Sequence, residues 1–154
     1  MRLLLDDNVV IDYLVKRDPF YDDARLIMLL GAMNEVELWF GAHQLNDVFY
    51  VVSEGGKASL GLMWQERIRQ LRQFMRICSI QEADIDAVLD LGWLDFEDAC
   101  VYQCAQKTRA DFIITRDLHG FEHSSIPVLA PGDFFKWLKE HKGLIYAEVY
   151  LPDE

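Results

Sequence analysis

One stretch decides the fold of this chain: Arg2-Leu3-Leu4-Leu5-Asp6-Asp7-Asn8-Val9-Val10-Ile11-Asp12. Its unbroken apolar start is typical of a central parallel strand that is covered by helices on both faces. Two carboxylates and an amide follow, and then a helical pattern begins, for which we expect Asn8 to be the N-cap. Ligands of open parallel sheets bind outside the carboxyl ends of the strands. We therefore expect Asp6, Asp7 and Asn8 to lie at the edge where the chemistry takes place.

Strand-like and helix-like patterns alternate along the rest of the chain. Short apolar runs predict further strands at residues 36–40, 76–80, 111–115 and 126–129. Apolar residues at helical spacing predict helices at residues 9–16, 21–33, 43–53, 60–74, 82–90, 96–108 and 131–141. Strands that alternate with helices are typical of the α/β class, so we expect a three-layer α/β/α sandwich around a mostly parallel central sheet.

The length of the chain suits one hydrophobic core. The 154 residues contain no internal repeat and no low-complexity linker, so we expect a single domain over residues 1–154. Within it, residues 144–154 are expected to form a C-terminal tail, in which residues 144–151 supply an extra strand or bind a partner. The segment 55–61, which is rich in glycine, is the loop that we expect to be most flexible.

The composition limits the possible functions. The formal net charge is −11, which counts against a nucleic-acid binder that relies on a basic surface. A cluster of metal-binding carboxylates also makes a chain acidic, however, and a bound metal reverses the local field. The three cysteines form no CxxC pair, and neither a signal peptide nor an apolar stretch of membrane-spanning length is found. We expect a cytoplasmic protein with reduced thiols and no membrane span.

Four aspartates occupy equivalent places at strand or helix ends. Asp6 follows the first strand, Asp117 follows the fourth, and Asp47 and Asp98 lie near the start of helices. Because parallel strands end at one edge of a sheet, we expect these acids to meet there, with Thr115 beside them. Such a group must take up metal or protons, and Mg²⁺ prefers oxygen ligands. Metal held by carboxylates is an arrangement that activates water for phosphodiester cleavage.

These stretches together resemble a known family. The opening stretch 3–12 is similar to the first motif of the PIN-domain ribonucleases, which include the VapC-type toxins of bacterial toxin–antitoxin pairs. Asp95-Phe96-Glu97-Asp98-Ala99 resembles their third motif, and Ile113-Ile114-Thr115-Arg116-Asp117 resembles their fourth. The segment 126–131 is similar in type and position to the end of the family pattern. The resemblance covers roughly residues 1 to 140, and the ordered set of motifs carries it.

The resemblance implies a metal-dependent endoribonuclease with a PIN-like fold. Mg²⁺ or Mn²⁺ would be held by Asp6, Asp98 and Asp117, and Asp47 would join these three as a catalytic acid. The resemblance also implies an RNA substrate, a small antitoxin as partner and a homodimer. Apolar surface that includes Trp39, Phe49 and Tyr50 is a candidate for the dimer contact.

The sequence departs from the family pattern at three positions. Asp47 stands where glutamate is usual, and its side chain is one methylene shorter. Asp7 stands where a small residue is common, and Gly120 stands near Asp117 at a position that is often acidic.

Some of these residues have structural alternatives. Asp6 could cap the first helix, although Asn8 is the expected cap, and Asp47 could be an ordinary first-turn acid. Asp98 could complement the dipole of its helix, and Asp117 could cap a turn that contains Gly120. We interpret Asp95 as a helix cap and Asp12 as a solvated or structural residue. The arginines of the fourth helix follow a helical stripe that suits RNA phosphates, but a solvated face is the favoured interpretation. The stripe comprises Arg69, Arg72 and Arg76, and Arg67 lies on the same helix. The four histidines have no metal-binding spacing.

Two other classes of function remain as alternatives. A PIN-like domain without activity would serve only to bind a partner protein. A phosphoacceptor receiver domain also carries an acidic pair after its first strand. That fold needs an aspartate after strand three and a lysine after strand five, and the sequence has neither.

Overall fold

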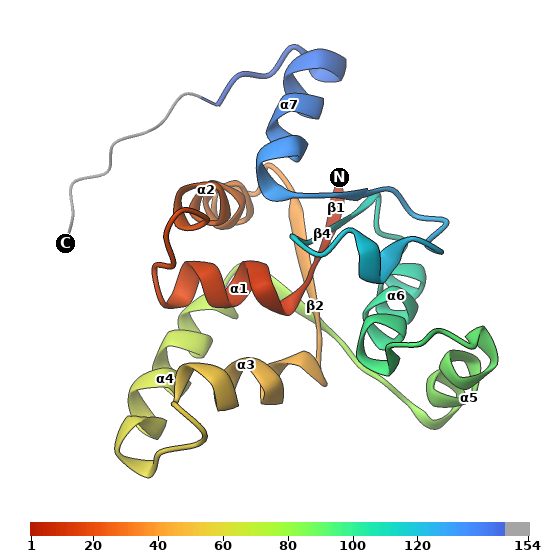
Figure 1. Ribbon diagram of the computed structural model, residues 1–154. Helices are drawn as coiled ribbons and strands as arrows, with labels where there is room; N and C mark the ends of the chain where they lie inside the picture. The colour runs from red at the N-terminus through yellow and green to blue at the C-terminus, as the bar shows by residue number, and fades with distance from the viewer. Residues whose placement is uncertain (147–154) are drawn as a thin grey trace.

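The computed structural model describes residues 1–146, and within them a five-stranded sheet forms the centre of the molecule (Figure 1). The strand order is β3-β2-β1-β4-β5, and every neighbouring pair is parallel. The strands are β1 (Arg2–Leu5), β2 (Glu37–Gly41), β3 (Met75–Cys78), β4 (Phe112–Ile114) and β5 (Val128–Leu129). A receiver domain has the order 2-1-3-4-5, so the observed order rules that alternative out.

The first strand lies at the middle of the sheet because its apolar run is buried on both faces. Leu4 is in register with Trp39 of β2 on one side and with Ile113 of β4 on the other. Leu3 and Leu5 pack into the larger core, whereas Leu4 packs into the core on the opposite face. All three leucines are fully buried. The prediction of a central strand covered on both sides is confirmed.

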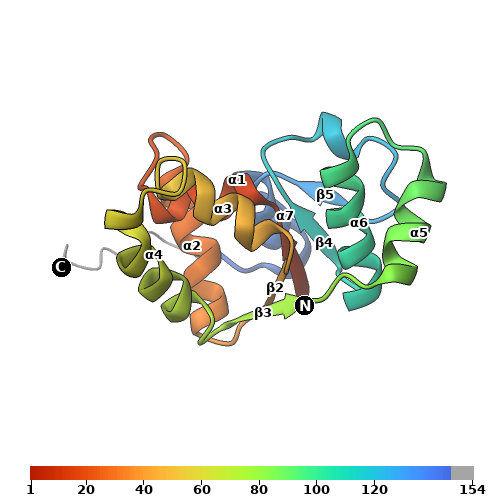
Figure 2. The same cartoon turned by 90° about the horizontal axis from the view of Figure 1, so that it is seen from below.

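Helices cover both faces of the sheet and complete the three layers (Figure 2). The larger core lies on the side of the first four helices and α7, and the smaller core lies under α6. The helices are α1 (Asp7–Leu14), α2 (Tyr21–Ala32), α3 (Gln44–Val52), α4 (Ala58–Leu71), α5 (Glu82–Leu91), α6 (Phe96–Thr108) and α7 (Pro131–Lys142). The expected α/β/α sandwich is therefore observed.

Several element boundaries differ from the predicted ones. Residues 58–60 already belong to α4, so the glycine-rich loop is shorter than expected. β5 begins at Val128, because Pro127 has no N–H and takes part in the sheet only through its carbonyl, which accepts from Ile113 N. Residues 144–146 form no regular element, and the rest of the expected tail, 147–154, lies outside the described residues.

The structure also tests the expectations about thiols and membranes. Cys78, Cys100 and Cys104 are buried and form no disulfide, as expected for small apolar side chains. Among the helices of residues 1–146, none combines the length and the apolar character that crossing a membrane requires.

Candidate metal centre

The acids that follow β1 and β4 meet those at the start of α3 and α6. Asp6 comes directly after β1, and Asp117 comes three residues after β4. Asp47 lies in the first turn of α3, and Asp98 lies in the first turn of α6. All four elements present these residues at the carboxyl edge of the parallel sheet, which is where the strand pattern predicted a site.

Asp6 is the most firmly held acid of this edge. Its Oδ1 accepts a hydrogen bond from Asp7 N at 2.8 Å. Its Oδ2 accepts from Asn8 Nδ2 at 2.6 Å and from Thr115 Oγ1 at 2.6 Å. Only 4% of Asp6 is exposed, and this burial, reinforced by the charge of Asp117, raises its pKa despite the three donors. The carboxylate therefore has one fixed orientation.

The prediction that Asn8 caps the first helix is wrong. Asp6 is the N-cap of α1, because its side chain accepts from the first helical N–H. Asn8 instead joins the two central strands, since its Oδ1 accepts from Arg116 N at 3.0 Å and its Nδ2 also donates to Thr115 Oγ1. Its role thus depends on residues more than 100 positions away, which a local capping pattern cannot show.

Glu97 links two groups of acids into one cluster. Oxygen atoms of Asp6, Glu97 and Asp98 lie within 4.8 Å of one another, and so do oxygen atoms of Asp7, Asp47 and Glu97. Glu97 Oε1 is buried, and no donor within residues 1–146 is bonded to it. A buried carboxylate oxygen without a donor is costly unless a cation or a proton occupies its place.

The pKa values of these acids show how crowded the cluster is. Burial raises the pKa of Glu97 to about 8, with further contributions from the charges of Asp7 and Asp6. Burial and the charge of Asp6 raise the pKa of Asp7 to about 7, and burial together with Asp95 raises that of Asp98 to about 6. At neutral pH the cluster therefore retains protons. An all-oxygen donor set that gathers this much negative charge fits a hard divalent cation.

Asp117 lies beside Asp98 around the backbone of Gly120. Its Oδ1 accepts from Gly120 N at 3.1 Å, so Asp117 does cap this turn. A Cβ atom on residue 120 would lie 2.3 Å from Asp98 Oδ2 and 3.2 Å from Asp117 Oδ2. The absent side chain therefore leaves room for both carboxylates. Asp117 is not in either of the two closest groups of acids, although its charge contributes to the raised pKa of Asp6 and of Asp98.

Asp95 and Gln44 support the cluster without belonging to it. Asp95 is the N-cap of α6, and its Oδ1 accepts from Glu97 N at 2.9 Å and from Asp98 N at 3.2 Å. Gln44 is fully buried, and its Nε2 donates to Asp7 Oδ1 at 2.8 Å and to the carbonyl of Leu5. Asp95 therefore sets the start of α6, as predicted, and Gln44 orients Asp7.

The structure adds two acids to those predicted from the sequence. Asp47 reaches the cluster although it is shorter than the usual glutamate, and it does so beside Asp7 and Glu97. Asp7 was expected at this edge without a role as a ligand, and Glu97 was regarded only as a neighbour of Asp98. The signal available in the sequence was that Asp7 is adjacent to Asp6 and that Glu97 is adjacent to Asp98.

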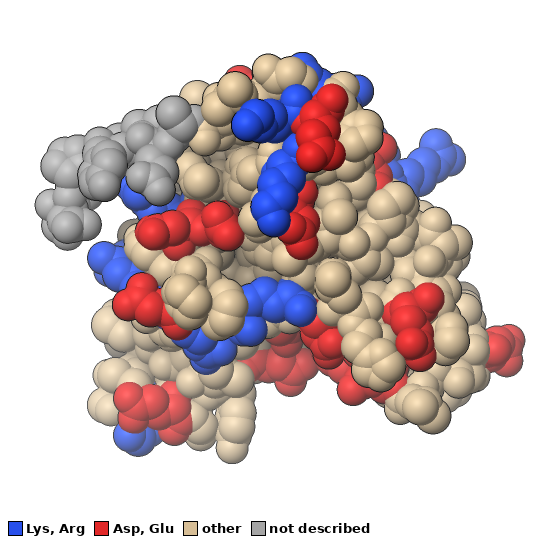
Figure 3. All heavy atoms as spheres, turned by 45° about the horizontal axis from the view of Figure 1, so that its top comes forward, with Lys and Arg blue, Asp and Glu red and all other residues tan. Residues whose placement is uncertain are grey.

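The arginine stripe makes local surface contacts. Arg69 pairs with Glu66 on the same helix, and Arg76 pairs with Glu37 and lies over the ring of Trp39. In Figure 3, basic and acidic side chains lie side by side over the upper and left parts of the visible face, acidic side chains alone lie over its lower right part, and no continuous basic surface is seen. These contacts agree with the favoured interpretation of a solvated face.

Comparison with known proteins places this geometry in a family. No match was found among curated protein sequences. FitAcB from Neisseria gonorrhoeae has a similar structure, with a TM-score of 0.63 and 18% identity over 84% of this chain and 98% of that chain. A toxin–antitoxin complex from Klebsiella pneumoniae matches with a TM-score of 0.59 and 22% identity over 84% and 97% of the two chains. VapBC2 from Rickettsia felis, bound to a promoter DNA fragment, matches with a TM-score of 0.61 and 14% identity over 84% of this chain and 98% of that chain.

At these identities the likeness of the structures shows a shared fold. A family model of the PIN domain matches residues 2–119, and the chain therefore belongs to the PIN-domain family.

Proposed function

We propose that this protein is a divalent-metal-dependent endoribonuclease that hydrolyses phosphodiester bonds of RNA. The observation that carries the proposal is the cluster of acids at the carboxyl edge of the sheet that shares Glu97, a residue whose Oε1 is buried without a donor within residues 1–146. Membership of the PIN-domain family supports it, because the family resemblance implies nuclease activity. The net charge of −11 does not oppose RNA binding in this proposal, because acidic residues attract the metal ion and the bound ion reverses the local field.

The residues present fit a metal ion of the Mg²⁺ or Mn²⁺ type. Asp6, Glu97 and Asp98 would hold it, with Asp117 beside Asp98 and Asp47 beside Glu97. A divalent cation in such a site polarises the phosphodiester and lowers the pKa of water, which supplies a nucleophile at neutral pH. The sequence had assigned the ligands to Asp6, Asp98 and Asp117, and Glu97 is the addition that the geometry suggests.

Neighbouring donors hold the carboxylate of Asp6 in place, and two acids of the cluster bind protons while no cation is present. Thr115 and Asn8 keep Asp6 Oδ2 oriented toward the cluster, so no side-chain freedom is lost when a ligand arrives. Glu97 and Asp7, with pKa values of about 8 and about 7, carry protons at neutral pH while no cation is bound. Cation binding therefore releases protons, and its affinity rises with pH.

We further propose that the protein is the toxin of a toxin–antitoxin pair or a related PIN nuclease. Similar folds occur in toxin–antitoxin complexes, which supports a small antitoxin as partner. A homodimer is also proposed. Tyr50, named from the sequence as a dimer candidate, is 63% exposed, and it shares the surface of α3 and α4 with other exposed apolar residues. These are Val51, Leu62 and Met63. The reduced thiols agree with a cytoplasmic location.

The test is cleavage of a mixed, structured RNA pool by purified protein with Mg²⁺, Mn²⁺ or EDTA. Asp6→Asn removes the fixed carboxylate, and Asp90→Asn makes the same change on the exposed surface of α5 as a matched control. We expect metal-dependent cuts by wild type and by Asp90→Asn, and none by Asp6→Asn. Cuts that survive both EDTA and Asp6→Asn would contradict the proposal. Inert wild-type protein, free of any co-purified inhibitor, would favour the alternative of a PIN-like domain that only binds a partner.

A further inference from the structure

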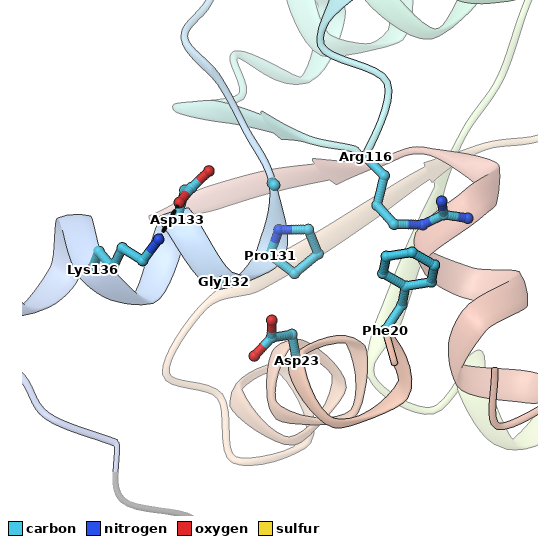
Figure 4. Close-up of a pocket in the computed structure, with 8 residues that line it drawn as sticks. Phe20, Asp23, Arg116, Pro131, Gly132, Asp133 and Lys136 are labelled. Carbon is cyan, nitrogen blue, oxygen red and sulfur yellow. Dashed lines mark hydrogen bonds and ion pairs between the residues drawn. The ribbon is translucent and has the colours of Figure 1, made fainter. Parts of the chain in front are cut away.

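A pocket of about 500 Å³ lies at the carboxyl edge of the sheet, beside the first turn of α7. It lies between the start of α2, the residue after Thr115 and the first turn of α7 (Figure 4). Its walls are mixed, with a ring and a proline beside charged groups. The lining residues are Phe20, Asp23, Arg116, Ala130, Pro131, Gly132, Asp133 and Lys136. The volume falls in the range of small-ligand sites.

The guanidinium of Arg116 and the ring of Phe20 form one flat wall of this pocket, and Asp12 fixes the orientation of the guanidinium. Asp12, which is 1% exposed, accepts from Arg116 Nε at 2.6 Å and from Nη2 at 3.3 Å, so the guanidinium cannot turn freely. Its central carbon lies 4.1 Å from the centre of the Phe20 ring, and Figure 4 shows the two groups facing each other. Part of Phe20 remains accessible, since 37% of the residue is exposed. Asp12 is thus structural and not solvated.

Asp23 brings an unused acceptor to the same pocket. Its carboxylate lies against the first turn of α7, where a Cβ atom on Gly132 would come within 2.7 Å of Asp23 Oδ2. Within residues 1–146, Asp23 makes no hydrogen bond and no ion pair, whereas Lys136 is bonded to Asp133 at 2.7 Å. Asp23 is an exposed residue of α2, and partial burial together with the charge of Asp22 raises its pKa, whereas the charge of Lys136 lowers it.

The pocket and the acidic cluster share one segment of chain. Arg116 stands between Thr115, which donates to Asp6, and Asp117. The backbone N–H of Arg116 is bonded to Asn8, and Asn8 in turn donates to Asp6. Arg116 follows β4 and Ala130 follows β5, so the pocket lies at the same carboxyl edge of the sheet as the acids. A nucleotide that neighbours the cleaved phosphodiester would lie along this edge.

We propose that this pocket binds one base of a single-stranded RNA substrate, and that the base presents two adjacent N–H donors to Asp23, as guanine does. The proposal rests on the nuclease function argued above. Proteins that read single-stranded RNA stack bases on aromatic rings and on arginine planes, and they bond the Watson–Crick edge. Arg116 is paired with Asp12 and Lys136 with Asp133, so the charged group of the lining that is left to select a ligand is the carboxylate of Asp23, which favours a ligand with N–H donors.

The test measures binding without cleavage. Fluorescence anisotropy is recorded for labelled single-stranded pentanucleotides that carry guanosine, inosine or adenosine at one position, with Asp6→Asn protein. Inosine lacks the exocyclic amino donor and so isolates one of the two hydrogen bonds. We expect guanosine to bind best, and we expect Asp23→Asn to weaken its binding by about tenfold and to remove the preference, since a hydrogen bond to a charged group is lost.

Two further variants distinguish binding in the pocket from an effect of surface charge alone. Asp22→Asn makes the same change on the neighbouring exposed residue of α2 and is expected to leave binding and preference unchanged. Phe20→Ala is expected to weaken all oligonucleotides by about tenfold, because a stacking surface is lost. Near-UV circular dichroism checks that each variant is folded.

The outcomes distinguish this proposal from the nuclease proposal. A guanosine preference that persists in Asp23→Asn, or binding that is unaffected by Phe20→Ala, would overturn the base pocket even if RNA cleavage is observed. Base-dependent binding that Asp23→Asn removes would support the pocket even if no metal-dependent cleavage is found, in which case the nuclease proposal alone would fail.

Discussion

Replacing Glu97 with glutamine should stabilise the metal-free protein at neutral pH. The pKa of Glu97 is raised from 4.5 to about 8 in the folded protein, so at pH 7 the folded chain binds a proton that the unfolded chain has released. Over the interval from pH 4.5 to pH 7, this costs about 3 kcal/mol at ~1.4 kcal/mol per pH unit. The side chain is partly exposed, and solvent screening reduces the expected gain to about 1–2 kcal/mol. Glutamine has the same shape and binds no proton, so it removes the penalty.

The expected difference in unfolding midpoint between Glu97→Gln and wild type depends on pH. A carboxyl group whose folded pKa is raised lowers the stability of the wild type as the pH rises from 4.5 toward 8. Thermal unfolding in EDTA should therefore show a midpoint about 3–6 °C higher for Glu97→Gln than for wild type at pH 7.5. Near pH 5 the two midpoints should nearly coincide. Glu140→Gln, on the exposed face of α7, is the matched control and should change neither value.

Divalent cation should reverse the order of stability. Mn²⁺ should bind the folded wild type and raise its midpoint by mass action, whereas Glu97→Gln would lack one proposed ligand and should respond less. The reasoning would be refuted if Glu97→Gln were no more stable than wild type at pH 7.5 in EDTA. It would equally be refuted if the gain were the same at pH 5, because a packing effect would not depend on pH.

Two further substitutions test the supports of the site. Asp12→Asn leaves the guanidinium groups of Arg116 and Arg17 without their shared counter-charge, and urea denaturation should show a loss of about 2–3 kcal/mol. An unchanged midpoint would mean that these arginines do not depend on Asp12. Gly120→Ala places a methyl group against Asp98 Oδ2, so isothermal calorimetry should show at least tenfold weaker Mn²⁺ binding with little change in global stability. Unchanged affinity would show that Asp98 can move aside.

The layers of the fold could be predicted from the sequence because they depend on local patterns. The run Leu3 to Leu5 identified the central strand, and helical spacing identified the helices with errors of about one turn or less at their ends. Local caps could also be recognised, and Asp95 is an example. The strand order could not be predicted, because it depends on which strands pair, and pairing leaves no trace in a single short apolar run.

The site was predictable only in outline. Acids that follow parallel strands one and four were predicted to lie at the same edge of the sheet, and Asp6 does lie near Asp117. The roles of Asn8 and Asp12 were misjudged or left open, because each depends on a partner more than 100 residues away in the sequence. Glu97 was overlooked for another reason. A first-turn glutamate is common on helices, and only the packing of α6 against β1 shows that its oxygen is buried without a donor.

The central position of β1 also determines when the acidic cluster can assemble during synthesis. β1 is synthesised before β4, and the hydroxyl of Thr115 that holds Asp6 belongs to a residue 109 positions later. At a translation rate of about 5–20 residues per second, Asp6 waits roughly 5–20 s for that partner. A nascent chain that lacks β4 cannot align its acids, so the cluster can form only after Thr115 has been synthesised.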